Sequence, residues 1–201
     1  MSGTRTYRIS TRAAAAEATR ERIIEAALLA FTSEWYDDVT LRGIAADAGV
    51  ALQTLVNHFG TKEALFGVAV ERFDDTIKAA RATVAGDDVP GAITTLVDDY
   101  EENGDAIVRM LALEDRIAVL RPALERGRRG HEQWVERVFA AALERLREAE
   151  RARRIAELVA ATDVYTWKLL RRDKGLTRKQ TILAVREMVE ALHNEAKGGP
   201  R

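Results

Sequence analysis

The chain has no cysteine, which excludes disulfides and thiolate metal sites and fits a reducing compartment. It also has no apolar run long enough to cross a bilayer, and no signal peptide is visible. We therefore expect a cytoplasmic protein that has no membrane partner.

An excess of either charge is also absent. The chain has 31 Lys and Arg residues against 32 Asp and Glu residues, and residues 1–72 have eight against nine. This balance argues mildly against nucleic-acid binding, because neutralised phosphates supply most non-specific affinity. The local placement of arginine favours nucleic-acid binding, since Arg5, Arg8 and Arg12 stand in a segment that has no acidic residue.

Motifs for catalysis are missing as well. The three histidines, His58, His131 and His193, form no pair at metal-ligand spacing. The sequence has no phosphate-binding glycine loop and no nucleophile-elbow motif. We therefore expect no enzyme activity, no cofactor and no metal site.

The most informative segment is residues 39–65, whose pattern predicts two short helices, a tight turn and the start of a third helix. Thr40 suits the N-cap of a helix that starts at Leu41, and Gly49 suits its end. Leu55 and Phe59, four residues apart, face inward together on the second helix. Thr61 then caps the third helix. This arrangement is a helix-turn-helix, which places a helix in the DNA major groove.

The rest of the chain shows helical periodicity and no convincing strand. We predict an all-α protein of about nine helices, including a long helix at residues 61–84 and a break at Asn103–Asp105. The predicted domains are a flexible basic arm (1–16), a three-helix helix-turn-helix DNA-binding domain (17–72), a larger helical ligand-binding and dimerisation domain (73–196) and a tail (197–201).

The pattern Val39-Thr…Ile44-Ala…Ala48-Gly-Val…Thr54-Leu…His58-Phe…Lys62-Glu-Ala-Leu65 strongly resembles the TetR family of transcriptional regulators. The resemblance covers roughly residues 17–72. It implies an all-helical homodimer, usually a repressor, that a small ligand releases from its operator DNA.

The resemblance also implies DNA-contacting residues, and two positions depart from the family pattern. Ala51 stands where the family often has a serine cap, and Val56 stands where it commonly has a tyrosine. The implied contacts are Thr40, Arg42, Leu52, Gln53, Thr54, Val56, His58 and Lys62.

Chemistry suggests separate roles for these contacts. Gln53 is a candidate base contact with adenine as its natural partner, and Val56 could touch a thymine methyl group. Thr54 and His58 are better suited to phosphate, and Arg42 is a candidate phosphate clamp. The alternative for Gln53 and Arg42 is a solvated surface side chain, and the alternative for His58 is a structural histidine.

Polar groups recur on apolar helix stripes in the second domain, where an unpaired buried group is costly. One solution is a cavity in which these groups orient an apolar effector. The alternatives are that they reach solvent or an arginine such as Arg116 or Arg121, and that Trp167 packs in the core. The candidate ligand-binding residues are Tyr100, Met110, Glu114, His131, Trp134 and Trp167.

Two further stripes near the C-terminus predict a homodimer through a four-helix bundle, although both stripes could instead cover the monomer core. The candidate interface residues are Val159, Thr162, Tyr165, Leu169, Ile182, Val185, Val189 and Leu192.

Together these features predict a ligand-responsive, sequence-specific transcriptional regulator. Its expected partners are double-stranded operator DNA, a small and largely apolar effector, and a second copy of the chain. The alternative is a helical small-molecule-binding or interaction module whose DNA-reading unit is degenerate.

Overall fold

The computed structural model describes residues 3–81 and 88–195, which form helices and turns and contain no strand. Within these ranges there are ten α-helices, α1 to α10, with one short 3-10 helix (η1) and one π-helical turn (η2). The all-α prediction is therefore confirmed, with one helix more than expected. The chain divides into two compact units: unit 1 comprises residues 1–73 and 117–120, and unit 2 comprises residues 74–116 and 121–201.

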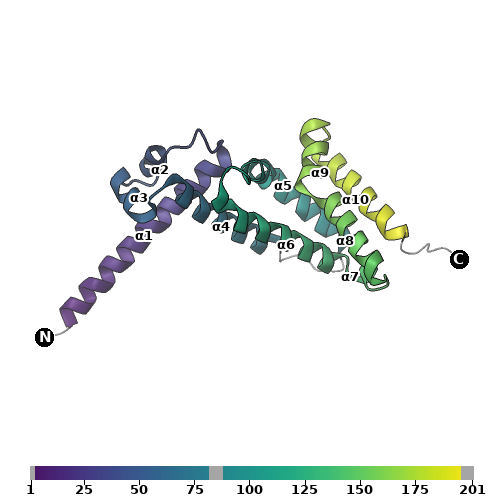
Figure 1. The fold of residues 1–201 in the computed structure, drawn as a ribbon, viewed down its shortest axis with the longest axis horizontal. Coiled ribbons are helices and arrows are strands. Elements are labelled where there is room, and N and C mark those ends of the chain that lie inside the picture. Colours follow the sequence, from purple (N-terminus) through teal and green to yellow (C-terminus); the bar gives the residue numbers. More distant parts are fainter. Residues whose placement is uncertain (1–2, 82–87, 196–201) are drawn as a thin grey trace. The chain divides into compact units, whose positions relative to one another are not determined.

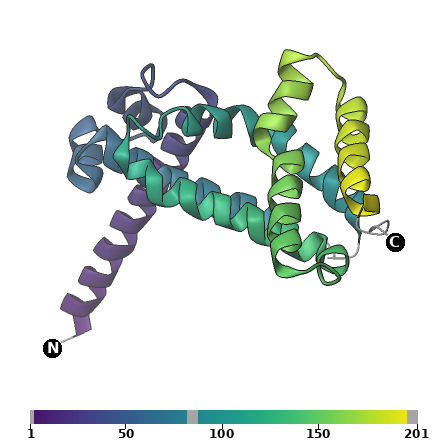
Figure 2. The same cartoon turned by 45° about the vertical axis from the view of Figure 1, so that its right-hand side comes forward.

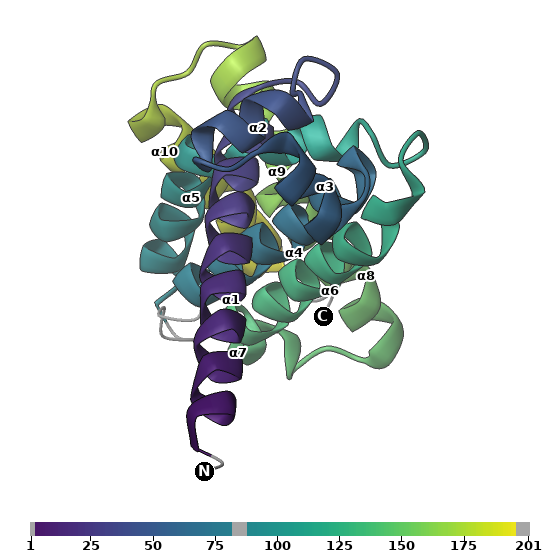
Figure 3. The ribbon, with the colours of Figure 1, turned by 90° about the vertical axis from the view of Figure 1, so that its left-hand side faces the viewer.

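Unit 1 contains α1 (Gly3–Ser33), α2 (Leu41–Asp47), α3 (Leu52–Phe59), the first part of α4 (Lys62–Arg81) and η1 (Ala118–Leu120). Figure 3 shows α2 lying against α1, and α3 packs against α2. Apolar side chains at helical spacing on each helix face one core, because burying each of them contributes roughly 1.5–3 kcal/mol. The buried residues include Ile23, Ile24, Ala27, Phe31, Ile44, Leu55, Leu65 and Phe66.

The prediction of a flexible arm at residues 1–16 is wrong, because α1 is helical from Gly3. The physical reason is visible in the sequence. Residues 13–16 are four consecutive alanines, and alanine has the highest intrinsic helix propensity. The first helix therefore extends well beyond the residues that reach the core.

Unit 2 contains the end of α4 followed by α5 (Val89–Leu111), α6 (Arg121–Val138), α7 (Ala140–Leu143), α8 (Glu148–Thr162), α9 (Val164–Lys168), η2 (Leu169–Asp173) and α10 (Arg178–Glu195). Helix α5 contacts α9 and α10, and α8 contacts α6 and α10 (Figures 1 and 2). One apolar core, from Ala92 on α5 to Val189 on α10, joins these helices. The predicted tail at residues 197–201 lies outside the described residues.

The break predicted at Asn103–Asp105 is also wrong, since α5 runs unbroken through these residues. Gly104 serves packing rather than a turn. A Cβ atom at this position would lie 2.4 Å from Cζ3 of Trp167, so the missing side chain lets the indole lie against the helix backbone. Asn103 stays within the helix, where its Nδ2 donates to Asp99 Oδ1 at 2.9 Å.

The chain instead breaks at Asp163, between α8 and α9. Asp163 has an extended backbone (φ −72°, ψ 153°), and its Oδ1 accepts from the backbone N–H of Tyr165 at 2.8 Å. Aspartate favours this N-cap role over a helix interior. The single helix expected near residues 153–172 is therefore two helices followed by a π-helical turn.

Candidate functional site

The helix-turn-helix of unit 1 has the caps that its sequence predicts. The hydroxyl of Thr40 accepts from the backbone N–H of Gly43 at 3.0 Å, and that of Thr61 accepts from Ala64 at 3.1 Å. Gly49 lies in the left-handed region (φ 65°), which costs glycine little. Ala51 precedes α3 without a side-chain cap, as the departure from the family pattern implies.

Helix α3 has one buried side and one accessible side. Leu55 is fully buried and anchors the helix to the core of unit 1, and Phe59 is half-buried. Four of the predicted DNA-contacting residues are exposed and two are half-buried. The exposed ones are Arg42, Leu52, Gln53 and His58, and the half-buried ones are Thr54 and Val56.

The other two predicted contacts already have structural partners within unit 1. The hydroxyl of Thr40 is the N-cap described above. The ammonium of Lys62 donates to the backbone carbonyl of Tyr36 and lies 4.1 Å from the centre of the Tyr36 ring. Lys62 therefore joins α4 to the segment between α1 and α2.

One residue on the accessible side of α3 was missed by the sequence analysis. Asn57 is exposed, and its Oδ1 accepts a hydrogen bond of 2.9 Å from Gln53 Nε2, one helical turn away. The i, i+4 spacing of two amide side chains was the available signal. The bond orients the Gln53 amide before any ligand arrives.

Unit 2 contains a buried polar cluster on otherwise apolar helices. Tyr100 of α5 donates its hydroxyl proton to the backbone carbonyl of Thr162 at 3.1 Å. The hydroxyl of Thr162 lies 3.1 Å from Nε2 of His131 on α6. Tyr100, His131 and Thr162, which are distant from one another in the sequence, thus meet at the end of α8.

Arg81, at the end of α4, borders the same cluster. Its guanidinium lies 5.1 Å from the centre of the Tyr100 ring, and its Nε donates to Asp99 Oδ2 at 2.8 Å. Burial raises the pKa of Tyr100 to about 12, although the positive charge of Arg81 opposes that rise. Burial and the charge of Arg81 together lower the pKa of His131 from 6.5 to about 4. Tyr100 therefore stays protonated and His131 stays neutral at neutral pH.

Four of the six candidate ligand-binding residues come together. The rings of His131 and Trp134 are stacked at 5.6 Å, and those of Tyr100 and Trp167 lie 5.9 Å apart. Met110 is buried on α5 but is not part of the core cluster that holds Tyr100, Trp134 and Trp167.

Glu114 does not join them. Its Oε1 accepts from Arg128 Nη1 at 2.7 Å, and this hydrogen bond lowers the pKa of Glu114. The assignment of Glu114 to a cavity is therefore corrected. The alternative, in which it reaches an arginine, describes the structure better, although the partner is Arg128 rather than Arg116 or Arg121.

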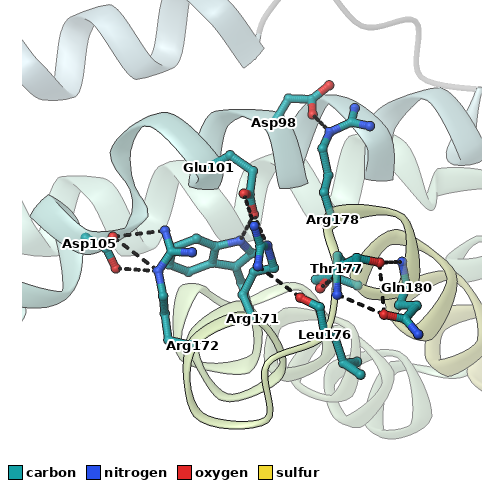
Figure 4. A network of polar contacts seen from close by, with 11 residues as sticks. Asp98, Glu101, Asp105, Arg171, Arg172, Leu176, Thr177, Arg178 and Gln180 are labelled. Atoms are coloured by element: carbon teal, nitrogen blue, oxygen red, sulfur yellow. Dashed lines mark hydrogen bonds and ion pairs between the residues drawn. The ribbon is translucent and has the colours of Figure 1, made fainter.

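A surface network joins α5 to η2 and α10 (Figure 4). Glu101 accepts from Arg171 Nε at 2.7 Å and from the indole N–H of Trp167 at 3.0 Å. Partial burial opposes ionisation of Glu101, but these hydrogen bonds outweigh it and lower its pKa. Asp105 pairs with Arg172, and Asp98 pairs with Arg178. The three carboxylates of α5 thus attach the π-helical turn and the start of α10.

The predicted dimer residues divide into two groups. Val185 and Val189 are buried in the core of their own chain, and Thr162 is buried beside His131, so their assignment to a dimer interface is corrected. Spacing along a helix identifies a stripe but not which surface covers it. Val159, Ile182 and Leu192 are half-buried against the core. Tyr165 and Leu169 are 52% and 48% exposed.

Leu183 of α10, which the sequence analysis did not select, is 56% exposed. It lies outside the stripe of Ile182, Val185 and Val189, so helical periodicity did not predict that it faces the core. Among the described residues of unit 2, the large apolar side chains with the greatest exposure are Tyr165, Leu169 and Leu183.

Two kinds of site are not found in the described part of the chain. It contains no group of three His, Cys, Asp or Glu residues that could hold a metal ion. None of its helices is both long and apolar enough to cross a membrane.

Solved structures share the fold of the chain. A tetR-family transcriptional regulator from Streptomyces coelicolor is 16% identical, with a TM-score of 0.69, and the match covers 90% of this chain and 89% of the other. A protein described as a TetR-family transcriptional regulator from Mesorhizobium loti is 20% identical, with a TM-score of 0.66 and coverage of 90% and 97%. No curated protein matches the chain significantly.

The sequence itself matches a family model over the helix-turn-helix. Residues 23–69 match the family described as bacterial regulatory proteins, tetR family, and this range runs from the inward face of α1 through α2 and α3 into α4. In its caps, its turn and its sequence, the helix-turn-helix of this chain is similar to that family over residues 23–69.

Proposed function

We propose that the protein is a dimeric, sequence-specific repressor that binds double-stranded operator DNA and is released by a small, largely apolar effector. The observation that carries the DNA-binding part is the accessible side of α3, which presents Gln53 and His58 while Leu55 holds the helix in the core. A helix held in this way suits insertion into the major groove.

Gln53 and Asn57 act together in this proposal. Because Asn57 Oδ1 accepts one proton of Gln53 Nε2, the amide plane of Gln53 is fixed. Its remaining proton and its oxygen supply the donor and acceptor that adenine N7 and N6 require. Arg42 and His58, which are also exposed, would contact phosphates and set the position of the helix.

The first prediction concerns base recognition. Gln53→Ala should reduce operator affinity by about 1–3 kcal/mol and relax the base preference at one symmetric pair of positions. Asn57→Ala should relax the preference at the same pair, because the Gln53 amide is then free to rotate. Selection from a library of random DNA duplexes, followed by titration of the selected duplex, measures both effects.

Gln133→Ala is the matched control, since Gln133 is an exposed glutamine of α6 in unit 2. Arg42→Ala should instead weaken all sequences alike and reduce the slope of log affinity against log salt by about 1. A wild-type protein that selects no sequence from the library would refute the repressor and favour a helical binding module with a degenerate DNA-reading unit.

The effector response is assigned to the buried cluster around His131, and α4 is the proposed link. Residues 62–73 of α4 belong to unit 1, and its later residues belong to unit 2. Its terminal Arg81 contacts Asp99 and Tyr100. A guest at the cluster would thus act on the helix that directly follows α3 in the chain. By linkage, it must weaken operator binding by the factor by which the operator weakens its own binding.

The proposed dimer surface comprises Tyr165, Leu169 and Leu183, which are the exposed apolar side chains of α9, η2 and α10. Exposed apolar side chains that form one contiguous patch are typical of sites that another protein covers. A two-fold dimer would bury them against their own copies, as closed symmetry requires. This surface replaces Val185 and Val189, whose burial in the monomer excludes them.

The second prediction tests this surface. Leu183→Asp should raise the free energy of association by about 3 kcal/mol, because the carboxylate would be buried without a partner. The folded monomer should keep its stability, since Leu183 is exposed there. Sedimentation equilibrium and denaturant unfolding measure the two quantities. Leu29→Asp, at an exposed leucine of unit 1, is the control. A wild-type protein that is monomeric at micromolar concentration would contradict the proposed dimer.

A further inference from the structure

The buried cluster of unit 2 contains one polar atom that has no partner. His131 is only 8% exposed, and its Nδ1 is fully buried without a hydrogen bond among the described residues. A buried polar atom of this kind is uncommon, because it loses its hydrogen bond to water and gains nothing in return. The atom therefore has an unused capacity for one hydrogen bond inside the buried cluster.

The neighbouring hydrogen bonds determine whether this atom is a donor or an acceptor. Thr162 Oγ1 has one proton, and it donates that proton to the carbonyl of Leu158 at 2.7 Å. Its contact with His131 Nε2 must therefore be one in which Thr162 accepts and Nε2 donates. The imidazole also donates to the backbone of Val159, and because Nδ1 has no partner, that donor is Nε2 as well. A neutral imidazole has a single N–H group, so Nδ1 has a lone pair and no proton. The orphaned atom is an acceptor.

The charges near the cluster restrict the ligand further. Tyr100 has already donated its only hydroxyl proton to the carbonyl of Thr162, so it cannot supply the missing donor. Arg81 lies close enough for its charge to disfavour a second positive charge on His131, and it would likewise disfavour a cationic guest. Glu114, the carboxylate among the candidate ligand-binding residues, is paired with Arg128 and so does not favour a cationic guest.

We propose that His131 Nδ1 accepts a hydrogen bond from a neutral hydroxyl or N–H group of an otherwise apolar ring compound. This inference rests on the proposed function, because it names the chemical class of the effector. An ether, a ketone or a carboxylate has only acceptor oxygens, so it could not form a hydrogen bond with the lone pair of His131 Nδ1. The apolar core that contains Tyr100 and Trp134 suits an aromatic or alicyclic body.

Two matched pairs of probes test the proposal on the full-length protein. Indole and 2-naphthol each have one donor, whereas 1-methylindole and 2-methoxynaphthalene have the same rings without it. Calorimetric titration should show that each donor compound binds about tenfold more tightly than its methylated analogue, because the analogue leaves Nδ1 unpaired. Nitrogen-15 NMR of the imidazole, assigned by comparison with His131→Phe, should show that the donor compounds move the Nδ1 resonance.

In His131→Phe, which keeps an aromatic ring but lacks the acceptor, the two members of each pair should bind equally. Equal binding in the wild type would overturn the proposal, and so would a Nδ1 resonance that none of the four compounds moves. The repressor is judged separately, by DNA selection without any probe. Probes that bind at His131 but leave operator affinity unchanged would support the site and refute its role as the effector site.

Discussion

Trp167→Ala should lower the free energy of unfolding by about 3–5 kcal/mol, the largest stability effect that we expect from a single substitution in this chain. Trp167 is almost fully buried, and its ring lies against both Tyr100 and the backbone at Gly104. Its indole N–H also donates to Glu101. Truncation would leave a cavity at the contact between α5 and α9, and denaturant unfolding with a linear extrapolation would measure the loss.

Because of the same contact, we expect Gly104→Ala to lower the free energy of unfolding, although glycine-to-alanine substitutions inside helices usually raise it. Helix propensity alone predicts that alanine in the middle of α5 stabilises the protein by about 1 kcal/mol. The added Cβ would lie 2.4 Å from the Trp167 ring, which cannot move aside easily, so we expect a loss of about 1–3 kcal/mol. Gly127→Ala in α6 is the control, because its Cβ would meet nothing nearer than 4.0 Å and should stabilise. Stabilisation by both substitutions would show that Gly104 has no packing role.

Acidification should destabilise the protein through His131. The pKa of this residue is lowered from 6.5 to about 4 in the folded chain. Between these values the unfolded chain binds a proton that the folded chain does not, so the free energy of unfolding falls as pH falls. The full difference corresponds to about 3 kcal/mol and is complete once pH has fallen through the folded value.

Denaturant unfolding at pH 7, 6 and 5 measures this effect in a range where most carboxylates are still ionised. His131→Phe should remove the part of the slope that depends on this imidazole, so the difference between wild type and variant isolates it. A difference that stays constant from pH 7 to pH 5 would mean that His131 has an ordinary pKa. A compound that donates to Nδ1 should steepen the dependence, because it binds only the neutral ring.

The proposals separate into a DNA-reading function and an effector function that depend on different residues. Gln53 and Asn57 belong to unit 1, whereas His131 and Tyr100 belong to unit 2. Substitutions in one set should therefore leave the intrinsic binding of the other ligand unchanged and alter only the coupling between them. That coupling is one free energy, measurable from either ligand.

The sequence by itself determined the features that depend on local spacing. Thr40, Gly49 and Thr61 marked the ends of the helices because caps and left-handed turns depend on the residue type at one position. The inward faces of α1 and α3 followed from apolar residues three and four apart. These signals also carry the resemblance to the TetR family, whose model matches residues 23–69.

Only the tertiary structure decided what covers each helix face and which distant groups meet. Gly104 was interpreted as a break because its real neighbour, Trp167, is far away in the sequence. Val185 and Val189 formed a stripe that suited a dimer or a core equally well, and only packing showed that they are buried in one chain. The hydrogen bonds that leave His131 Nδ1 unpaired join α6 to α8, and residue spacing contains no information about such contacts. Periodicity reports the orientation of a residue within its own helix, whereas burial and pairing depend on the helices that pack against it.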